Sequence, residues 1–153
     1  MLYLVRHAHA LDAENDAVRP LSDQGRQQVR ALARFLAGSS AFRPEDIWHS
    51  GLVRARETAQ LLAAQLKLAA PLHEMPDLRP EDDPTATVRR LKLVRRPLAI
   101  VGHEPHLSAL ASLLVVGAAE PPAFVFKKCC ALALDPAGTH WMVRWHISPD
   151  LLP

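Results

Sequence analysis

The chain has 153 residues, 49% of them hydrophobic and 22% charged, with a formal net charge of +2 when the histidines are neutral. These values are typical of one globular domain with a substantial core, so we expect a single domain over residues 1–153. Nucleic-acid binding and membrane insertion are excluded, because the net charge is small and no apolar stretch approaches the length of a membrane span.

The first elements are a strand, a loop and a helix. Residues 1–6 read as a buried strand, which Arg6 interrupts too early for a secretory signal peptide, so a cytoplasmic protein is expected. Residues 10–21 are polar and read as a loop. Ser22 is a good N-cap for a helix that Gly38 ends. The predicted apolar face of this helix consists of Val29, Leu32, Ala33, Phe35 and Leu36.

The middle of the chain alternates strands and helices. Strands are predicted at residues 47–49 and 71–74, on either side of a helix over residues 52–66. Residues 76–84 hold three prolines and four acidic residues and read as a surface loop. A helix over residues 85–94 follows, and the basic residues between positions 89 and 96 are interpreted as a solvated face.

The last third is predicted to contain a strand at residues 98–102, a helix at 107–116 and two strands, 124–134 and 140–146. Residues 135–138, Asp-Pro-Ala-Gly, are the predicted hairpin turn between these two strands. Cys129 and Cys130 are adjacent, and a disulfide between neighbours would be strained, so they are expected to be small core residues on opposite faces. Lys127 and Lys128 also alternate across the predicted strand, so only one of them can face the side of the sheet on which a ligand pocket would lie.

The order of these elements predicts the fold class. Strands that alternate with helices favour an α/β protein with a mostly parallel sheet and helices on both faces. The expected architecture is therefore a three-layer α/β/α sandwich that ends in a C-terminal antiparallel hairpin.

Basic residues stand where two of the buried strands end. Arg6-His7 stands at the end of the first strand, and Gly102-His103 stands at the end of the strand at residues 98–102. Since the carboxyl ends of parallel strands line the ligand crevice of such sheets, both histidines are expected in one pocket. That pocket suits an anion, and phosphate is the obvious candidate.

Phosphoryl transfer needs a nucleophile and groups that stabilise charge on the phosphoryl oxygens. His7 is the candidate nucleophile, and Arg6, Arg54 and His103 are the candidate phosphate-binding groups. Arg54 lies one turn into its helix, where free N–H groups also favour anions. The eight histidines show no metal-ligand spacing, so neither a metal nor another cofactor is expected.

The residues around these positions resemble the histidine phosphatase (phosphoglycerate mutase-like) superfamily. Residues 4–8, Leu-Val-Arg-His-Ala, are similar to its Arg-His-Gly hallmark, and residues 50–59 match its Ser-x-x-x-Arg-Ala-x-x-Thr-Ala segment. Gly102-His103 is similar to its late Gly-His or Ser-His pair, and residues 21–25 resemble the segment that opens its first helix. Because the chain is too short for a cap insertion, it resembles the SixA-type branch of phosphohistidine phosphatases, which lack one.

The resemblance implies a metal-independent phosphatase that acts on a phosphohistidine of a protein through a covalent phospho-His7 intermediate. Ala8 stands where the family has glycine, and His9 where the branch often has an acid. Asp77 is the candidate proton donor, and Arg19 is a further candidate phosphate-binding residue. Because His7 must be neutral to attack, kcat/KM is expected to fall on acidification, with a profile that is not flat between pH 5 and 8.

Two alternatives stay open at this point. The first is a phosphatase of the same fold that acts on a small phosphomonoester. The second is a phosphate-dependent binding module without turnover, which Ala8 and the uncertain proton donor keep open.

Overall fold

The computed structural model describes residues 1–152, so Pro153, the last residue of the predicted domain, lies outside the described residues. Six strands form one sheet: β1 (Leu2–Arg6), β2 (Asp46–His49), β3 (Leu72–Glu74), β4 (Leu98–Gly102), β5 (Ala131–Ala137) and β6 (His140–Ile147). Their spatial order is β3-β2-β4-β1-β5-β6. Strands β1 to β4 are parallel, and β5 and β6 run antiparallel at one edge.

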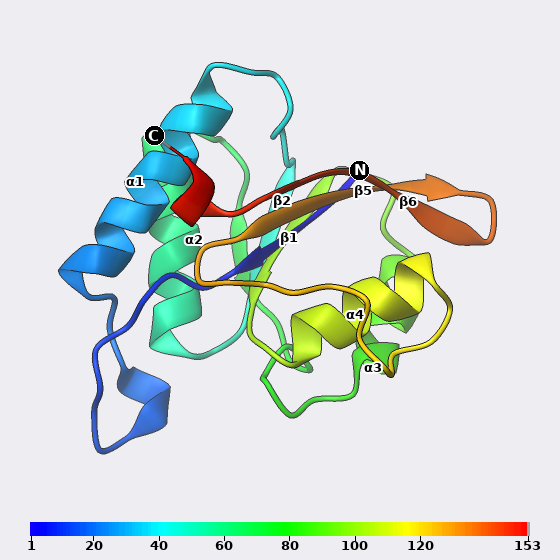
Figure 1. Cartoon of the computed structure of the whole chain (residues 1–153), viewed down its shortest axis with the longest axis horizontal. Helices are drawn as coiled ribbons and strands as arrows, with labels where there is room; N and C mark the ends of the chain where they lie inside the picture. The colour runs from blue at the N-terminus through cyan, green and yellow to red at the C-terminus, as the bar shows by residue number, and fades with distance from the viewer. Residues whose placement is uncertain (153) are drawn as a thin grey trace.

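Helices cover both faces of this sheet (Figure 1). They are α1 (Asp23–Ala37), α2 (Val53–Leu66), α3 (Pro84–Leu91) and α4 (His106–Val115), with two short 3₁₀ turns, η1 (Asp16–Val18) and η2 (Pro149–Leu151). Helices α1 and α2 pack together on one face, and α3 and α4 pack together on the other. The predicted α/β/α sandwich with a C-terminal hairpin is therefore confirmed. No helix within residues 1–152 is both long and apolar enough to cross a membrane.

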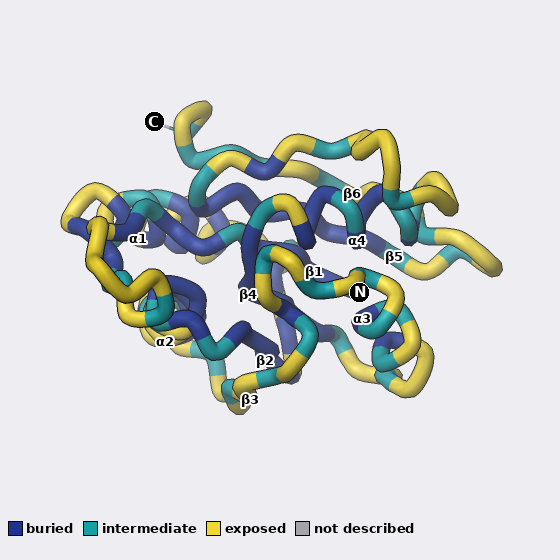
Figure 2. Tube along the Cα trace, turned by 90° about the horizontal axis from the view of Figure 1, so that it is seen from below, coloured by how far each residue is buried: buried dark blue, intermediate teal, exposed yellow. Residues whose placement is uncertain are grey.

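The strand β1 lies between two hydrophobic cores, one on each face of the sheet. Tyr3 and Val5 face the core beneath α1 and α2, whereas Leu2 and Leu4 face the core beneath α3 and α4. This alternation follows from the two-residue period of a strand. Both sets are buried, as a parallel strand covered on both faces requires, and Figure 2 shows the buried strands between more exposed outer segments.

Helix α1 begins and ends where the sequence predicts. The Ser22 hydroxyl accepts a hydrogen bond from the Gly25 N–H at 3.0 Å, and Gly38 is the C-cap. The predicted apolar face is wrong at one position, because the Phe35 side chain is 50% exposed. At 100° per residue, Phe35 lies about 60° outside Leu32, which is at the edge of the buried stripe, and about 100° from Leu36.

The boundaries of β5 differ most from prediction. The strand begins at Ala131 and not at residue 124, because the chain turns just before it: Cys129 has a φ of 60°, and the Cys130 N–H donates to the Lys127 carbonyl at 3.0 Å. At its other end β5 continues through Pro136, which the sequence places in the turn. This position lies beyond the residues that pair with β1, so the missing N–H of proline breaks no ladder there.

Helix α3 is three residues shorter at its C-terminal end than predicted, since it ends at Leu91. Leu93 is 83% exposed, so no apolar contact extends the helix over it. The two cysteines are buried, as expected, with Cys129 in the core beneath α1 and α2 and Cys130 in the other core. Their opposite orientation therefore holds, although they precede the strand.

The close approach of α1 to the loop after β1 gives a first prediction. A Cβ on Gly25 would lie 2.0 Å from the His9 carbonyl oxygen, so Gly25→Ala should lower the free energy of unfolding by about 2 kcal/mol or more. The control is Gly38→Ala, whose Cβ would meet no atom closer than 3.8 Å and should change stability by less than about 1 kcal/mol. Urea unfolding of both variants checks this, and equal midpoints would contradict it.

Candidate functional site

The pairing of β1 with β4 brings the two predicted histidines together. Arg6 is opposite Gly102 in the parallel register, and the His7 N–H donates to the Gly102 carbonyl at 2.9 Å. The rings of His7 and His103 consequently lie with their centroids 4.9 Å apart. Both side chains are almost fully buried.

The ring of His7 has a defined orientation. Its Nδ1 lies 2.7 Å from the Ala8 carbonyl oxygen, which can only accept a hydrogen bond, so Nδ1 carries the proton. In the neutral ring Nε2 then has a free lone pair. Both peptides of Ala8 are held: its N–H donates to Thr58 Oγ1 at 3.0 Å, and the His9 N–H, in the peptide that supplies the carbonyl, donates to Gln28 Oε1 at 2.9 Å.

The segment at residues 50–59 ties α2 to the ends of both strands. Ser50 Oγ lies 2.5 Å from His103 Nε2, at the start of the segment. Thr58 Oγ1 accepts from the Ala8 N–H and donates to the Arg54 carbonyl at 2.7 Å. Arg54, Ala8 and Thr58 are thereby held on the side of α2 that faces the strand ends. The spacing of four residues places these groups on one helix face.

The arginines of the site are held by the surrounding loops. Arg54 donates from Nη1 to the Asp16 carbonyl at 2.8 Å and from Nη2 to Asp16 Oδ2 at 3.1 Å, and it is 4% exposed. Arg19 also pairs with Asp16, at 3.2 Å, and donates from Nε to the Leu11 carbonyl at 2.9 Å. Arg6 donates from Nη1 to the Phe126 carbonyl. Arg54 and Arg19 share the carboxylate of Asp16, a residue that no sequence motif identifies.

A lysine that the sequence did not assign completes the group. Lys128 Nζ lies 3.3 Å from His7 Nε2, whereas Lys127 points away and pairs with Asp150. Only one of the two lysines faces the pocket, as expected, although both precede β5 and the predicted alternation across a strand is therefore wrong. No motif contains Lys128, and its only sequence signal is its alternation with Lys127.

Burial and positive charge keep both histidines neutral. Burial is the largest cause that lowers the pKa of His7 to about 2, and Lys128 and His103 add to it. Burial, followed by Arg54 and Lys128, lowers the pKa of His103 to about 3. Protonation of His7 in the free protein therefore lies well below pH 5, which corrects the expectation of an acid limb between pH 5 and 8.

Four cationic side chains, Arg6, Arg19, Arg54 and Lys128, lie near the carboxylate of Asp16. Two further carboxylates act at the margin of this group, since Asp12 pairs with Arg19 at 3.4 Å and the charge of Glu104 acts on Arg6. Burial is the largest cause that lowers the pKa of Lys128, and the charges of the three arginines add to it. A half-buried group of cations around two neutral imidazoles favours a multiply charged oxyanion over a neutral ligand. The arrangement can thus bind a phosphoryl group next to a free imidazole lone pair.

Three other predicted or noted residues lie in different settings. His9 Nδ1 lies 2.7 Å from Ser22 Oγ, so this side chain supports the start of α1. Asp77 pairs with Arg90 at 2.9 Å, and none of its contacts within residues 1–152 reaches His7. His106 is buried against Thr87, at 3.4 Å from Thr87 Oγ1. Among residues 1–152, no group of three or more His, Cys, Asp or Glu side chains could hold a metal ion.

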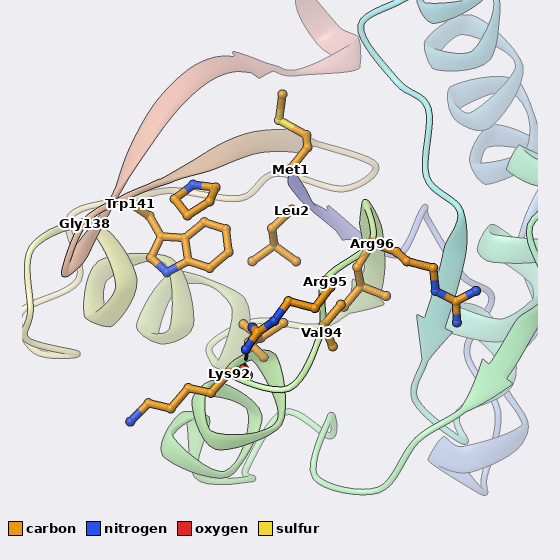
Figure 3. Close-up of a pocket in the computed structure, with 11 residues that line it drawn as sticks. Met1, Leu2, Lys92, Val94, Arg95, Arg96, Gly138 and Trp141 are labelled. Carbon is orange, nitrogen blue, oxygen red and sulfur yellow. Dashed lines mark hydrogen bonds between the residues drawn. The ribbon is translucent and has the colours of Figure 1, made fainter.

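A separate cavity of about 440 Å³ opens at the opposite end of the central strands (Figure 3). Met1, Leu2 and Leu98 line it at the starts of β1 and β4, whereas the histidines follow the ends of the same strands. Arg95 and Trp141 stand on its rim and wall, so part of the predicted basic face borders this cavity. It is distant from the histidine pair.

Comparisons with known proteins identify the family and the fold of this chain. The family model of the histidine phosphatase superfamily (branch 1) matches residues 2–81. Phosphohistidine phosphatase SixA of Escherichia coli (strain K12) is 28% identical in an alignment that covers 97% of this chain and 93% of that protein. A structure of the protein histidine phosphatase SixA complexed with tungstate is similar with a TM-score of 0.86 and 26% identity, covering 97% of each chain. The alpha-ribazole phosphatase from Shigella flexneri shares the fold, with a TM-score of 0.79 and 20% identity over 97% of this chain and 96% of that one.

The buried neutral histidines predict acid sensitivity of the fold. An unfolded histidine titrates near pH 6.5, whereas His7 and His103 bind a proton only near pH 2 to 3. Between these limits the unfolded chain binds more protons, so the free energy of unfolding should fall as the pH decreases from about 6.5. Urea unfolding at pH 7, 6 and 5 measures the slope.

The slope should become shallower in His103→Asn and stay unchanged in His140→Asn, which alters an exposed histidine. Equal slopes in the two variants would contradict the assignment of a neutral buried His103.

Proposed function

The chain belongs to the histidine phosphatase superfamily (branch 1) and is a hydrolase of the phosphatase class, and from this premise we propose that it hydrolyses a protein-borne phosphohistidine through a phospho-His7 intermediate. Its similarity to SixA proteins over 97% of its length confirms the predicted SixA-type branch. The observation that carries the proposed mechanism is the neutral His7 ring, with Nδ1 bonded to the Ala8 carbonyl and Nε2 among cationic side chains.

In the first step, the lone pair of His7 Nε2 forms a bond to phosphorus, and the bond from phosphorus to the substrate nitrogen breaks. The electron pair of that bond stays on the leaving nitrogen. A substrate imidazole with a proton on its other nitrogen departs as a neutral ring, so this step needs no proton from the protein. His7 keeps its proton on Nδ1 throughout, where it is hydrogen-bonded to the Ala8 carbonyl.

In the second step, water attacks phosphorus and the bond from phosphorus to Nε2 breaks, which returns the electron pair to His7. The oxygen and both protons of the water leave as dihydrogen phosphate, and the neutral His7 ring is restored. Because no proton passes through a carboxylate, the proposed mechanism requires no role for Asp77, which pairs with Arg90.

The neighbouring side chains are assigned to the phosphoryl oxygens. Arg6, Arg54 and His103 would stabilise the charge that spreads over these oxygens in the transition state. Ser50 and Asp16 would orient His103 and Arg54, through the contacts already described. Arg19 shares Asp16 with Arg54 and would add long-range positive charge.

Two findings on similar proteins support the substrate class. The curated relative is a phosphohistidine phosphatase, and a structurally similar SixA binds tungstate, a tetrahedral oxyanion like phosphate. The alternative of a small phosphomonoester substrate has a weaker basis, since the alpha-ribazole phosphatase is alike only in fold at 20% identity.

Replacing the nucleophile tests the proposed function. His7→Asn should lower kcat/KM for a phosphohistidine peptide by at least about 10³-fold, because the covalent route is lost. The exposed His140→Asn should retain wild-type activity. A chelator in the assay should change neither value.

The same assay separates the alternatives. Equal activity of His7→Asn and wild type would overturn the covalent mechanism. A clear preference for one of a panel of small phosphomonoesters over the peptide would overturn the protein substrate. Phosphate binding without turnover of any substrate would indicate a binding module.

A further inference from the structure

Lys128 is held in front of the proposed nucleophile by the segment that precedes β5. Figure 1 shows this segment, in yellow to orange, crossing from α4 toward the end of β1. Two backbone hydrogen bonds join it to β1 and its continuation: the Arg6 N–H donates to the Cys130 carbonyl at 3.0 Å, and the Cys129 N–H donates to the His7 carbonyl at 3.2 Å. The Arg6 side chain adds a third bond, to the Phe126 carbonyl. The lysine is therefore fixed relative to His7 on both sides of its own position.

We propose that Lys128 is a further catalytic residue, whose ammonium group binds an oxygen of the phosphoryl group while that group is attached to His7 or moving onto it. This assignment rests on the proposed function. No bond to Lys128 forms or breaks in it, and the lysine keeps its three protons throughout the reaction.

The geometry supports contact with the phosphoryl oxygens. Nζ lies 3.3 Å from Nε2, the atom that would bond to phosphorus. When phosphorus approaches Nε2, its three equatorial oxygens surround that line of approach at a similar distance from Nε2. A small rotation of the lysine side chain then moves its hydrogen bond from the lone pair of Nε2 to one of these oxygens.

Lys128 is also less committed to protein partners than the arginines. Arg54 uses both terminal nitrogens on Asp16, and Arg6 uses one on the Phe126 carbonyl. Within residues 1–152, Lys128 has no carboxylate at ion-pair distance, and its side chain has no hydrogen-bond partner other than His7. Its charge is therefore available to an incoming phosphoryl group, where a half-buried cation acts more strongly than in water.

The surroundings of Lys128 lower the pKa of its ammonium group. The titratable and charged groups that act on it come from the strand ends, α2 and the loop at η1, and they are Arg6, His7, Arg19, Arg54, His103 and Asp16. Burial, followed by the three arginines, lowers the pKa of the Lys128 ammonium to about 8, against the smaller opposing effect of Asp16. Deprotonation above that pH removes the proposed contact, so kcat/KM should fall as the pH rises through it.

The neighbouring lysine provides a matched control. Lys128→Met keeps the length of the side chain and removes its charge, and Lys127→Met makes the same change at an exposed residue that pairs with Asp150. We expect Lys128→Met to lower kcat/KM for the phosphohistidine peptide by about 10²-fold, which is typical of losing one donor to a transition-state oxyanion. Lys127→Met should stay within about twofold of wild type, and Lys128→Arg should recover part of the loss.

The pH profile distinguishes catalysis from a structural role. The substrate imidazole loses its second proton at a lower pH than Lys128, near 6.5 for an unperturbed ring, and this lowers kcat/KM in every variant alike. Wild type and Lys127→Met should show an additional fall near pH 8, which should be absent in Lys128→Met. Thermal unfolding of the two Met variants is measured in parallel; a lower midpoint with an unchanged pH profile would overturn the proposal. Lys128→Gln repeats the test if the Met variant does not fold.

This experiment also separates the proposal from the function on which it rests. Lys128→Met with the activity and pH profile of Lys127→Met would overturn the role of Lys128, while a fully impaired His7→Asn in the same assay would leave the covalent mechanism standing. If His7→Asn remains active, the proposed function itself fails.

Discussion

The hydrogen bond between His7 Nδ1 and the Ala8 carbonyl is the constraint on which the rest of the site depends. It fixes which nitrogen carries the proton, and thereby which nitrogen can attack phosphorus. The carbonyl is in place because Thr58 accepts the Ala8 N–H and Gln28 accepts the His9 N–H, and the ring is in place because β1 is paired with β4. A strand end, a helix and a neighbouring strand thus combine to orient one lone pair, as a site with preorganised groups requires.

The second feature of the site is an excess of positive charge in a half-buried place. Burying cations is unfavourable unless a counter-charge is near, and Asp16 is the carboxylate that both Arg54 and Arg19 use. The remaining positive charge disfavours protonation of His7 and His103. Burial is the larger cause of the neutral imidazoles, and the same positive charge that adds to it also attracts the phosphoryl group.

Much of the fold and part of the site could be predicted from the sequence. Apolar runs such as residues 98–102 predict buried strands, and the alternation with helices predicts a parallel sheet. Parallel strands expose their carboxyl ends together, so His7 and His103 could be expected to meet. The spacing of residues 54 and 58 also survives folding, because positions four apart share one helix face, and Ser50 comes just before this helix.

The remainder depends on contacts that no local pattern contains. The turn before β5 uses a positive φ at Cys129, a residue type that does not favour turns, so the strand is predicted too early. Lys128 reaches His7 across 121 positions of the chain, and the turn at Cys129 sets its direction. Asp16 lies in a polar loop with several other acids, and only the tertiary structure selects it as the partner of Arg54.

The central claim is that His7 is a neutral ring with its proton on Nδ1, and ¹⁵N NMR of the labelled protein measures this most directly. Long-range ¹H–¹⁵N correlations of the imidazole identify the protonated nitrogen at each pH. We expect His7 to show the Nδ1–H tautomer, unchanged from pH 8 to pH 5, because burial lowers its pKa to about 2. A proton on Nε2, or conversion to the imidazolium within this range, would contradict the account.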